Sequence, residues 1–105
     1  MRLQITTSQP IDNSINNDII LFMAAIEEIL NQMKRNPKGV RFNDLAKICE
    51  HFFGEPRQKG TSHKVYKTPW AGDPRVNIQN AKGKAKPYQV KQVLQAIERL
   101  EVQNG

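Results

Sequence analysis

A chain of 105 residues, 38% of them hydrophobic, can form one small domain with a modest core. Sixteen Lys and Arg against ten Asp and Glu give a formal net charge of +6, which favours a polyanionic partner: nucleic acid, an acidic protein or a membrane surface. The single cysteine, Cys49, excludes an internal disulfide framework and a clustered thiolate metal site. No apolar run approaches the roughly 18 to 20 residues that cross a bilayer, and residues 1–17 lack the pattern of a secretory signal, so a cytoplasmic protein without a membrane partner is expected.

Two amphipathic helices are predicted in the first half of the chain. Apolar residues recur at three- and four-residue intervals over residues 18–34, and a turn ending at Gly39 follows. A second helix is predicted over residues 44–53, with Asn43 as its N-cap. Its apolar stripe leaves His51 on the solvated side.

The second half of the chain changes to a strand pattern. Three strands are predicted, over residues 56–59, 62–68 and 75–79. A turn-rich stretch between the last two favours an antiparallel hairpin. Residues 80–86 are predicted as a basic loop, and Pro87 suits the first position of a last helix that runs to about Val102.

This order predicts an α+β fold in which a three-stranded antiparallel sheet has helices packed on one face. The second and last helices cover that face, and the other face stays open to water or to a partner. Residues 39–105 form this domain, and residues 1–38 are an N-terminal extension with one amphipathic helix. The apolar stripe of the extra helix must pack against the domain or against another chain, which allows a homo-oligomer.

Positive charge is concentrated in the sheet half of the chain. Residues 56–91 contain nine Lys and Arg and a single acidic residue, Asp73. Lys82, Lys84 and Lys86 precede a helix start, where free backbone N–H groups already favour an anion. Tyr66 and Trp70 offer ring faces on which unpaired bases could stack. The alternative is a solvated lysine surface with aromatic rings that serve only packing.

His63 is the strongest candidate for a catalytic residue. It follows a small, flexible run, Gly60-Thr61-Ser62, which lets a phosphate approach the backbone. Imidazole exchanges protons near neutral pH, so it can take a proton from a ribose 2′-hydroxyl or deliver one to a leaving oxygen. If Val65 packs under the helices, His63 lies at the helix-facing edge of the sheet, within reach of the basic loop. A structural role for a lone strand histidine is the alternative.

Other kinds of site are poorly supported. Two histidines and one cysteine do not make a zinc set, and metal-dependent hydrolysis needs more carboxylates than Asp73. Gly83-Lys84 lacks the other residues of a P-loop. Ser62 and His63 are adjacent, so on a strand they point to opposite faces, which does not suit a nucleophile and its base. No metal or cofactor is expected.

Three runs of the sequence, taken in order and with their spacing, resemble the HicA toxin family. They are Lys-Gly-Thr-Ser-His-Lys-Val-Tyr at 59–66, Arg-Val-Asn-Ile at 75–78 and Gly-Lys-Ala-Lys-Pro-Tyr-Gln-Val at 83–90. The resemblance covers about residues 39–100 and implies a fold like the double-stranded RNA-binding domain, ribosome-independent mRNA cleavage, and neutralisation by a HicB antitoxin. It places the family's catalytic histidine on His63. Thr61 lengthens the usual Gly-Ser-His step, and the N-terminal extension has no counterpart in short family members.

The function expected from these observations is that of a metal-independent endoribonuclease with His63 as general acid or base. The residues expected to contact RNA are Lys59, Ser62, Lys64, Tyr66, Lys82, Lys84 and Lys86. Two alternatives use the same fold without catalysis. One is a basic RNA-binding module, and the other is a protein-interaction subunit whose basic face meets an acidic partner.

Overall fold

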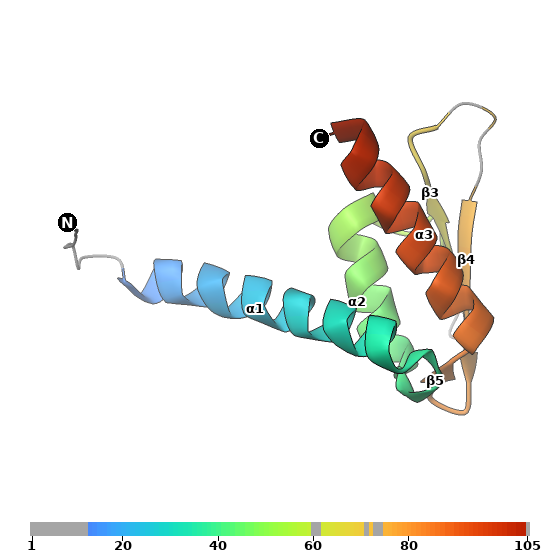
Figure 1. Ribbon diagram of the computed structural model, residues 1–105, viewed down its shortest axis with the longest axis horizontal. Helices are drawn as coiled ribbons and strands as arrows, with labels where there is room; N and C mark the ends of the chain where they lie inside the picture. Colours follow the sequence, from blue (N-terminus) through green and yellow to red (C-terminus); the bar gives the residue numbers. More distant parts are fainter. Residues whose placement is uncertain (1–12, 60–61, 71, 73–74, 105) are drawn as a thin grey trace.

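The structure, a computed structural model, describes residues 13–59, 62–70, 72 and 75–104 (Figure 1). Its elements, in chain order, are α1 (Asn13–Arg35), the short 3-10 helix η1 (Pro37–Gly39), α2 (Phe42–Phe53), β2 (Gln58–Lys59), β3 (His63–Lys67), β4 (Arg75–Ala81), β5 (Lys84–Ala85) and α3 (Pro87–Asn104). The predicted α+β class is confirmed, with an antiparallel sheet and three α-helices.

The sheet has the strand order β2-β3-β4-β5, and each neighbouring pair is antiparallel. In the central pair, His63 lies opposite Gln79 and Tyr66 lies opposite Val76. Burial alternates along the first part of β4, where Val76 and Ile78 are buried and Asn77 between them is exposed. One face of this pair therefore belongs to the core.

The segment predicted as a basic loop is a tight β-hairpin, so that prediction is wrong. Lys82 and Gly83 have φ angles of 55° and 85°, as the two central residues of a type I′ turn require. The Asn80 side chain accepts a hydrogen bond from the Gly83 N–H over 2.6 Å. Lys82-Gly83 is the turn of this hairpin, and the two residues of β5 pair with Asn80 and Ala81 at the end of β4.

The core lies between the sheet and the helices α2 and α3, which cover the same face (Figure 1). The strands contribute Tyr66, Val76, Ile78 and Ala85 to it. The helices contribute apolar residues at helical spacing, as predicted. Those that are fully buried are Leu45, Ile48 and Cys49 from α2 and Val90 and Val93 from α3.

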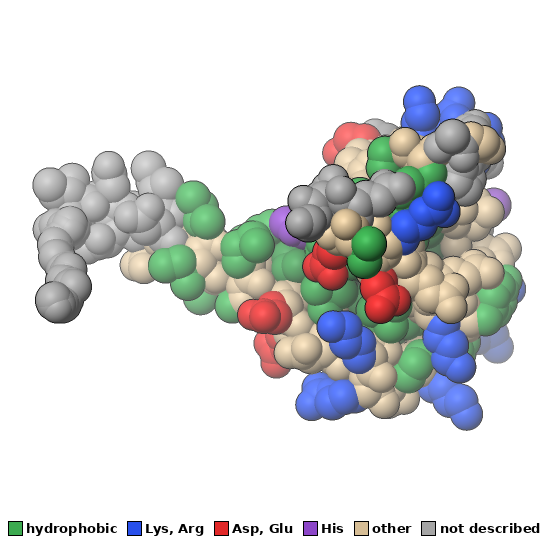
Figure 2. Space-filling view, turned by 45° about the horizontal axis from the view of Figure 1, so that its top comes forward, with side chains coloured by type: hydrophobic (Ala, Val, Ile, Leu, Met, Phe, Trp, Pro, Cys, Tyr) green, Lys and Arg blue, Asp and Glu red, His purple; other side chains and the backbone are tan. Residues whose placement is uncertain are grey.

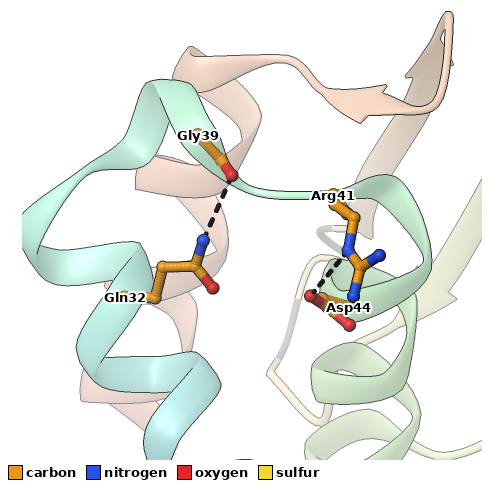
Figure 3. A network of polar contacts seen from close by, with 4 residues as sticks. All are labelled: Gln32, Gly39, Arg41 and Asp44. Carbon is orange, nitrogen blue, oxygen red and sulfur yellow. Dashed lines mark hydrogen bonds and ion pairs between the residues drawn. The ribbon is translucent and has the colours of Figure 1, made fainter.

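Helix α2 begins one residue before the predicted N-cap, so the assignment of Asn43 is wrong. The Phe42 N–H donates to the Gly83 carbonyl oxygen over 3.0 Å, and Arg41 forms a β-bridge with Lys84. These contacts fix the chain before the helix, and Arg41 occupies the N-cap position without a side-chain hydrogen bond there. Its Nε lies 3.6 Å from Asp44 Oδ2, an acidic residue in the first turn (Figure 3).

Helix α1 belongs to the core through its C-terminal half only. Ile26, Ile29 and Met33 are buried, and Gln32 Nε2 donates a hydrogen bond to the Gly39 carbonyl oxygen over 3.1 Å (Figure 3). The N-terminal half projects from the molecule (Figure 1). The Cα radius of gyration is accordingly 16.4 Å, against about 13 Å for a compact chain of this length. None of the described helices combines the length and apolar character needed to cross a membrane.

Candidate functional site

Strand β3 presents one face to α2, and its other face points away from the helices, with His63 partly exposed, Val65 buried and Lys67 exposed. Tyr66 lies in the core, and its hydroxyl donates a hydrogen bond to Glu50 Oε2 of α2 over 3.4 Å. Because side chains alternate along a strand, His63, Val65 and Lys67 lie on the opposite face. We expected His63 on the helix side if Val65 packed there. Tyr66 takes that place, so His63 lies on the face turned away from the helices.

The same alternation of side chains shows which residues of β4 and β5 lie on the face turned away from the helices. Val76 and Ile78 of β4 and Ala85 of β5 belong to the core, so the residues between them point the other way. We call this surface the open face. Its members are His63, Val65, Lys67, Arg75, Asn77, Gln79 and Lys84.

His63 is held at the start of β3. Its backbone lies opposite Gln79, and the Asn80 N–H donates to the Ser62 carbonyl oxygen over 2.9 Å. The imidazole is partly exposed, and Ser62 is exposed beside it. The hydrogen bond at Ser62 ties the chain to β4 just before His63, so the start of the strand has a defined position.

A buried amide connects this position to α3. Gln89, in the first turn of α3, is 3% exposed. Its Oε1 accepts a hydrogen bond from the Gln79 N–H over 2.8 Å, and its Nε2 donates to Gln79 Oε1 over 3.1 Å and to the Tyr88 hydroxyl over 3.4 Å. The Gln89 amide therefore takes the place of a neighbouring strand. We call His63, Gln79, Tyr88 and Gln89 the histidine site.

Positive charges flank the histidine site along the open face. At the far end of the hairpin, Lys67 and Arg75 are cross-strand partners and both are exposed. On the other side, Lys84 is exposed on β5, two strands from β3, a separation on the order of 10 Å. Lys82 is exposed at the hairpin tip, and Lys86 is partly exposed before α3. These cations can hold several phosphates of one extended polyanion.

Two residues predicted to contact RNA lie on the helix side of β3 instead. Tyr66 is completely buried, so the prediction that it stacks on a base is wrong. Lys64 Nζ lies 3.6 Å from Glu50 Oε2 and 5.9 Å from the centre of the Phe42 ring. Burial, followed by the nearby Cys49 and Glu50, raises the pKa of Tyr66. Tyr66 and Lys64 therefore connect β3 to α2 and are not part of the candidate site.

Two further sequence predictions concern Lys59 and Trp70. Lys59 lies in β2, opposite Lys64, and its side chain is outside the described part of the chain. Trp70 is buried, and the Arg99 guanidinium lies 4.3 Å from the centre of its ring. That face of the ring is covered by α3, so Trp70 is a packing residue rather than a platform for a base.

Sequence reasoning missed Lys67, Arg75, Gln79 and Gln89. For β4 the signal was present, because polar residues at positions 75, 77 and 79 alternate with buried Val76 and Ile78. For Gln89 no such signal existed, because its partner lies ten residues away across a strand pair and a turn.

No three His, Cys, Asp or Glu side chains in the described ranges gather closely enough to hold a metal ion. Comparisons of the chain with protein-family models, curated proteins and solved structures gave no match. The ground for a functional proposal is therefore the chemistry of the open face, together with the resemblance found in the sequence.

Proposed function

We propose that this protein is a metal-independent endoribonuclease that cleaves mRNA at His63, and that it is the toxin of a HicA/HicB-type pair in the cytoplasm. The observation that carries the proposal is a partly exposed imidazole on an open sheet face with cations on both sides. The resemblance of three sequence runs to the HicA family supports it, and so does an α+β fold compatible with the architecture of the double-stranded RNA-binding domain.

In the proposed reaction His63 accepts the proton of a ribose 2′-hydroxyl. The 2′-oxygen then bonds to the adjacent phosphorus, the bond from phosphorus to the 5′-oxygen breaks, and the departing oxygen takes a proton from water. The products are a 2′,3′-cyclic phosphate and a 5′-hydroxyl. Cations on the open face stabilise the negative charge that develops on the phosphate oxygens.

The neighbours of His63 have distinct roles in this proposal. Gln79, opposite His63 in the strand pair, offers its side-chain NH₂ group to the ribose or phosphate, and Ser62, exposed just before β3, offers a hydroxyl to a neighbouring phosphate. Lys82, Lys84 and Lys86 hold phosphates on one side of the scissile bond, and the Lys67–Arg75 pair holds them on the other. A HicB-type antitoxin with an acidic surface would block cleavage by covering the open face.

The decisive experiment is RNA cleavage by the purified chain in EDTA, with analysis of the product ends. We expect His63→Ala to lower the rate about 10²- to 10⁴-fold without a change in melting temperature. His51→Ala is the matched control, because His51 is exposed on α2 and contacts Phe22 and Phe52 instead. Intact RNA with the wild-type chain, or equal cleavage by the His63 variant, would overturn the proposal.

RNA binding without cleavage is a second candidate function. The exposed Lys67, Lys82 and Lys84 favour it, because they can hold phosphates whether or not His63 takes part in catalysis. It predicts salt-sensitive RNA binding that survives His63→Ala and leaves the RNA intact.

A further inference from the structure

A groove along α1 lies apart from the open face. It has a volume of about 590 Å³ and is lined by apolar residues of α1, by His51 and Phe52 of α2 and by Glu101 of α3. A second groove of about 330 Å³ shares Leu30 and Glu101 with it and continues to Lys34. The two adjoin at Leu30 and Glu101, and we call them together the α1 groove.

The wall that α1 contributes is apolar and uncovered. Five consecutive residues, Ile19 to Met23, are exposed, with Ile20 at 62% and Met23 at 48%. Five consecutive residues point in every direction around a helix of 3.6 residues per turn. Packing α1 on its own domain therefore leaves apolar surface uncovered, and Ile20 and Met23 line the groove. A contiguous exposed surface of this kind is typical of an interaction site.

The edges of the α1 groove are acidic, although the chain as a whole has a net charge of +6. Glu27 of α1 and Glu98 and Glu101 of α3 line it, whereas its described basic lining residues are Lys34 and His51. Figure 2 shows hydrophobic side chains along the projecting α1 and acidic ones where it meets the rest of the molecule. The acidic edges of the groove therefore have the opposite charge to the basic residues of the open face.

We propose that the α1 groove binds an amphipathic helix of another protein, apolar on one face and carrying Lys or Arg on its flanks. The stretch of α1 from Ile20 to Lys34 is about 21 Å long, which matches a helix of about 14 residues. The apolar face would cover Ile20 and Met23, and the flanking cations would meet Glu27 and Glu101. This inference does not depend on the proposed nuclease function.

Charge also argues against two other occupants. Residues 13–23 contain no Lys or Arg and one acidic residue, Asp18, so α1 of a second copy would bring a carboxylate to carboxylates. An anionic membrane surface would meet the same repulsion. A helix with cationic flanks fits both the apolar wall and the acidic edges.

The test uses the full chain and two synthetic 14-residue helical peptides with the same leucine face, one with Lys on its flanks and one with Glu. Binding is measured by fluorescence anisotropy of the labelled peptides. We expect the Lys peptide to bind at least about tenfold more tightly than the Glu peptide, and Ile20→Gln/Met23→Gln to weaken it by about tenfold. Glu27→Gln/Glu101→Gln should reduce the Lys-over-Glu preference by about threefold.

Glu28→Gln is the matched control, because Glu28 is on the same helix but outside the groove lining. It should leave both affinities unchanged, and circular dichroism should show the same helix content in all variants. Equal binding of the two peptides, or binding that is insensitive to the groove variants, would overturn the proposal. So would a dimer in analytical ultracentrifugation, or binding to vesicles of anionic lipid, that Ile20→Gln/Met23→Gln abolishes.

Discussion

Gln89 has a buried side-chain amide that forms hydrogen bonds with Gln79 near the end of β4 and with Tyr88 at the start of α3. Its Oε1 accepts the hydrogen bond of the Gln79 N–H, at a position of β4 that does not pair with β5. A residue of this kind acts on the site through its neighbour. It fixes where Gln79 lies, and Gln79 lies opposite His63.

Replacing Gln89 should therefore destabilise the fold. We expect Gln89→Ala to lower the free energy of unfolding by about 1 to 3 kcal/mol, because it removes a buried side chain and leaves partly buried polar groups of Gln79 without these hydrogen bonds. Tyr88→Phe removes only the weaker contact of an exposed side chain and should cost less than about 0.5 kcal/mol. Urea unfolding of the three chains checks this, and equal stability of Gln89→Ala and wild type would contradict it.

Alkaline pH should destabilise the protein through Cys49 and Tyr66. Burial is the largest cause that raises both pKa values in the folded chain. The unfolded chain loses these protons near its ordinary pKa values, about 8.5 for Cys and 10 for Tyr. The folded chain keeps them. The stabilisation is therefore fully present below those values and decreases as pH rises above them.

Each of the two groups should contribute a fall of up to about 1.4 kcal/mol per pH unit in the free energy of unfolding. Tyr66→Phe should remove the share of one group, so its stability should depend less steeply on pH above about pH 10. Tyr88→Phe, at an exposed tyrosine, should retain the wild-type slope. Urea unfolding between neutral pH and pH 11 measures all three, and identical slopes for Tyr66→Phe and wild type would refute the account.

At the scale of elements, the β4–β5 hairpin depends on the backbone of its turn. Gly83 has a φ angle of 85°, and apart from Gly83 and its two chain neighbours no residue has a heavy atom within 4 Å of the position that a Cβ would occupy. The cost of Gly83→Ala is therefore conformational, about 1 kcal/mol or more. Lys82→Asn is the control, because asparagine accepts positive φ readily and should leave stability unchanged or raise it. Thermal unfolding measures both, and a melting temperature of Gly83→Ala equal to that of wild type would show that the turn is not of this type.

The helices could be predicted from the sequence because their apolar residues recur at helical spacing. Periodicity gives the existence of an element more reliably than its ends. Helix α2 starts at Phe42, rather than after Asn43, because contacts with the distant residues Gly83 and Lys84 fix the chain before it. No local pattern contains that information.

Only part of the candidate site could be predicted from the sequence, again because contacts between distant residues decide the rest. His63 and the lysines of the hairpin could be singled out by residue type and charge, but the face of β3 could not be decided locally. Val65 and Tyr66 are both buried, and only their contacts show which one lies beneath α2. The histidine site, in which Gln89 reaches Gln79, required the register of the sheet and the position of α3.

At the scale of the whole molecule, the chain separates two surfaces of opposite character. The open face gathers Lys and Arg around His63, whereas the α1 groove is apolar with acidic edges. A polyanion and a cationic helix would therefore bind at different places on the same molecule. Helices α2 and α3 lie between these surfaces, so a helix bound in the groove would leave the proposed RNA-binding face uncovered.

This separation predicts where salt acts on RNA binding. A protein that neutralises phosphates on a single strand shows an affinity that falls with salt, with a slope of about 0.7 per contact in a double-logarithmic plot. In a His63→Ala background, which prevents cleavage, we expect Lys67→Ala and Lys84→Ala each to reduce that slope by about 0.7, because each removes one phosphate contact on the open face.

Lys47→Ala removes the same charge from an exposed position on α2 and should leave the slope unchanged. Filter binding between 50 and 300 mM KCl, about the range in which such slopes are measured, gives the comparison. If Lys47→Ala lowers the slope as much as Lys84→Ala does, RNA is attracted by net charge alone and the open face is not its binding surface.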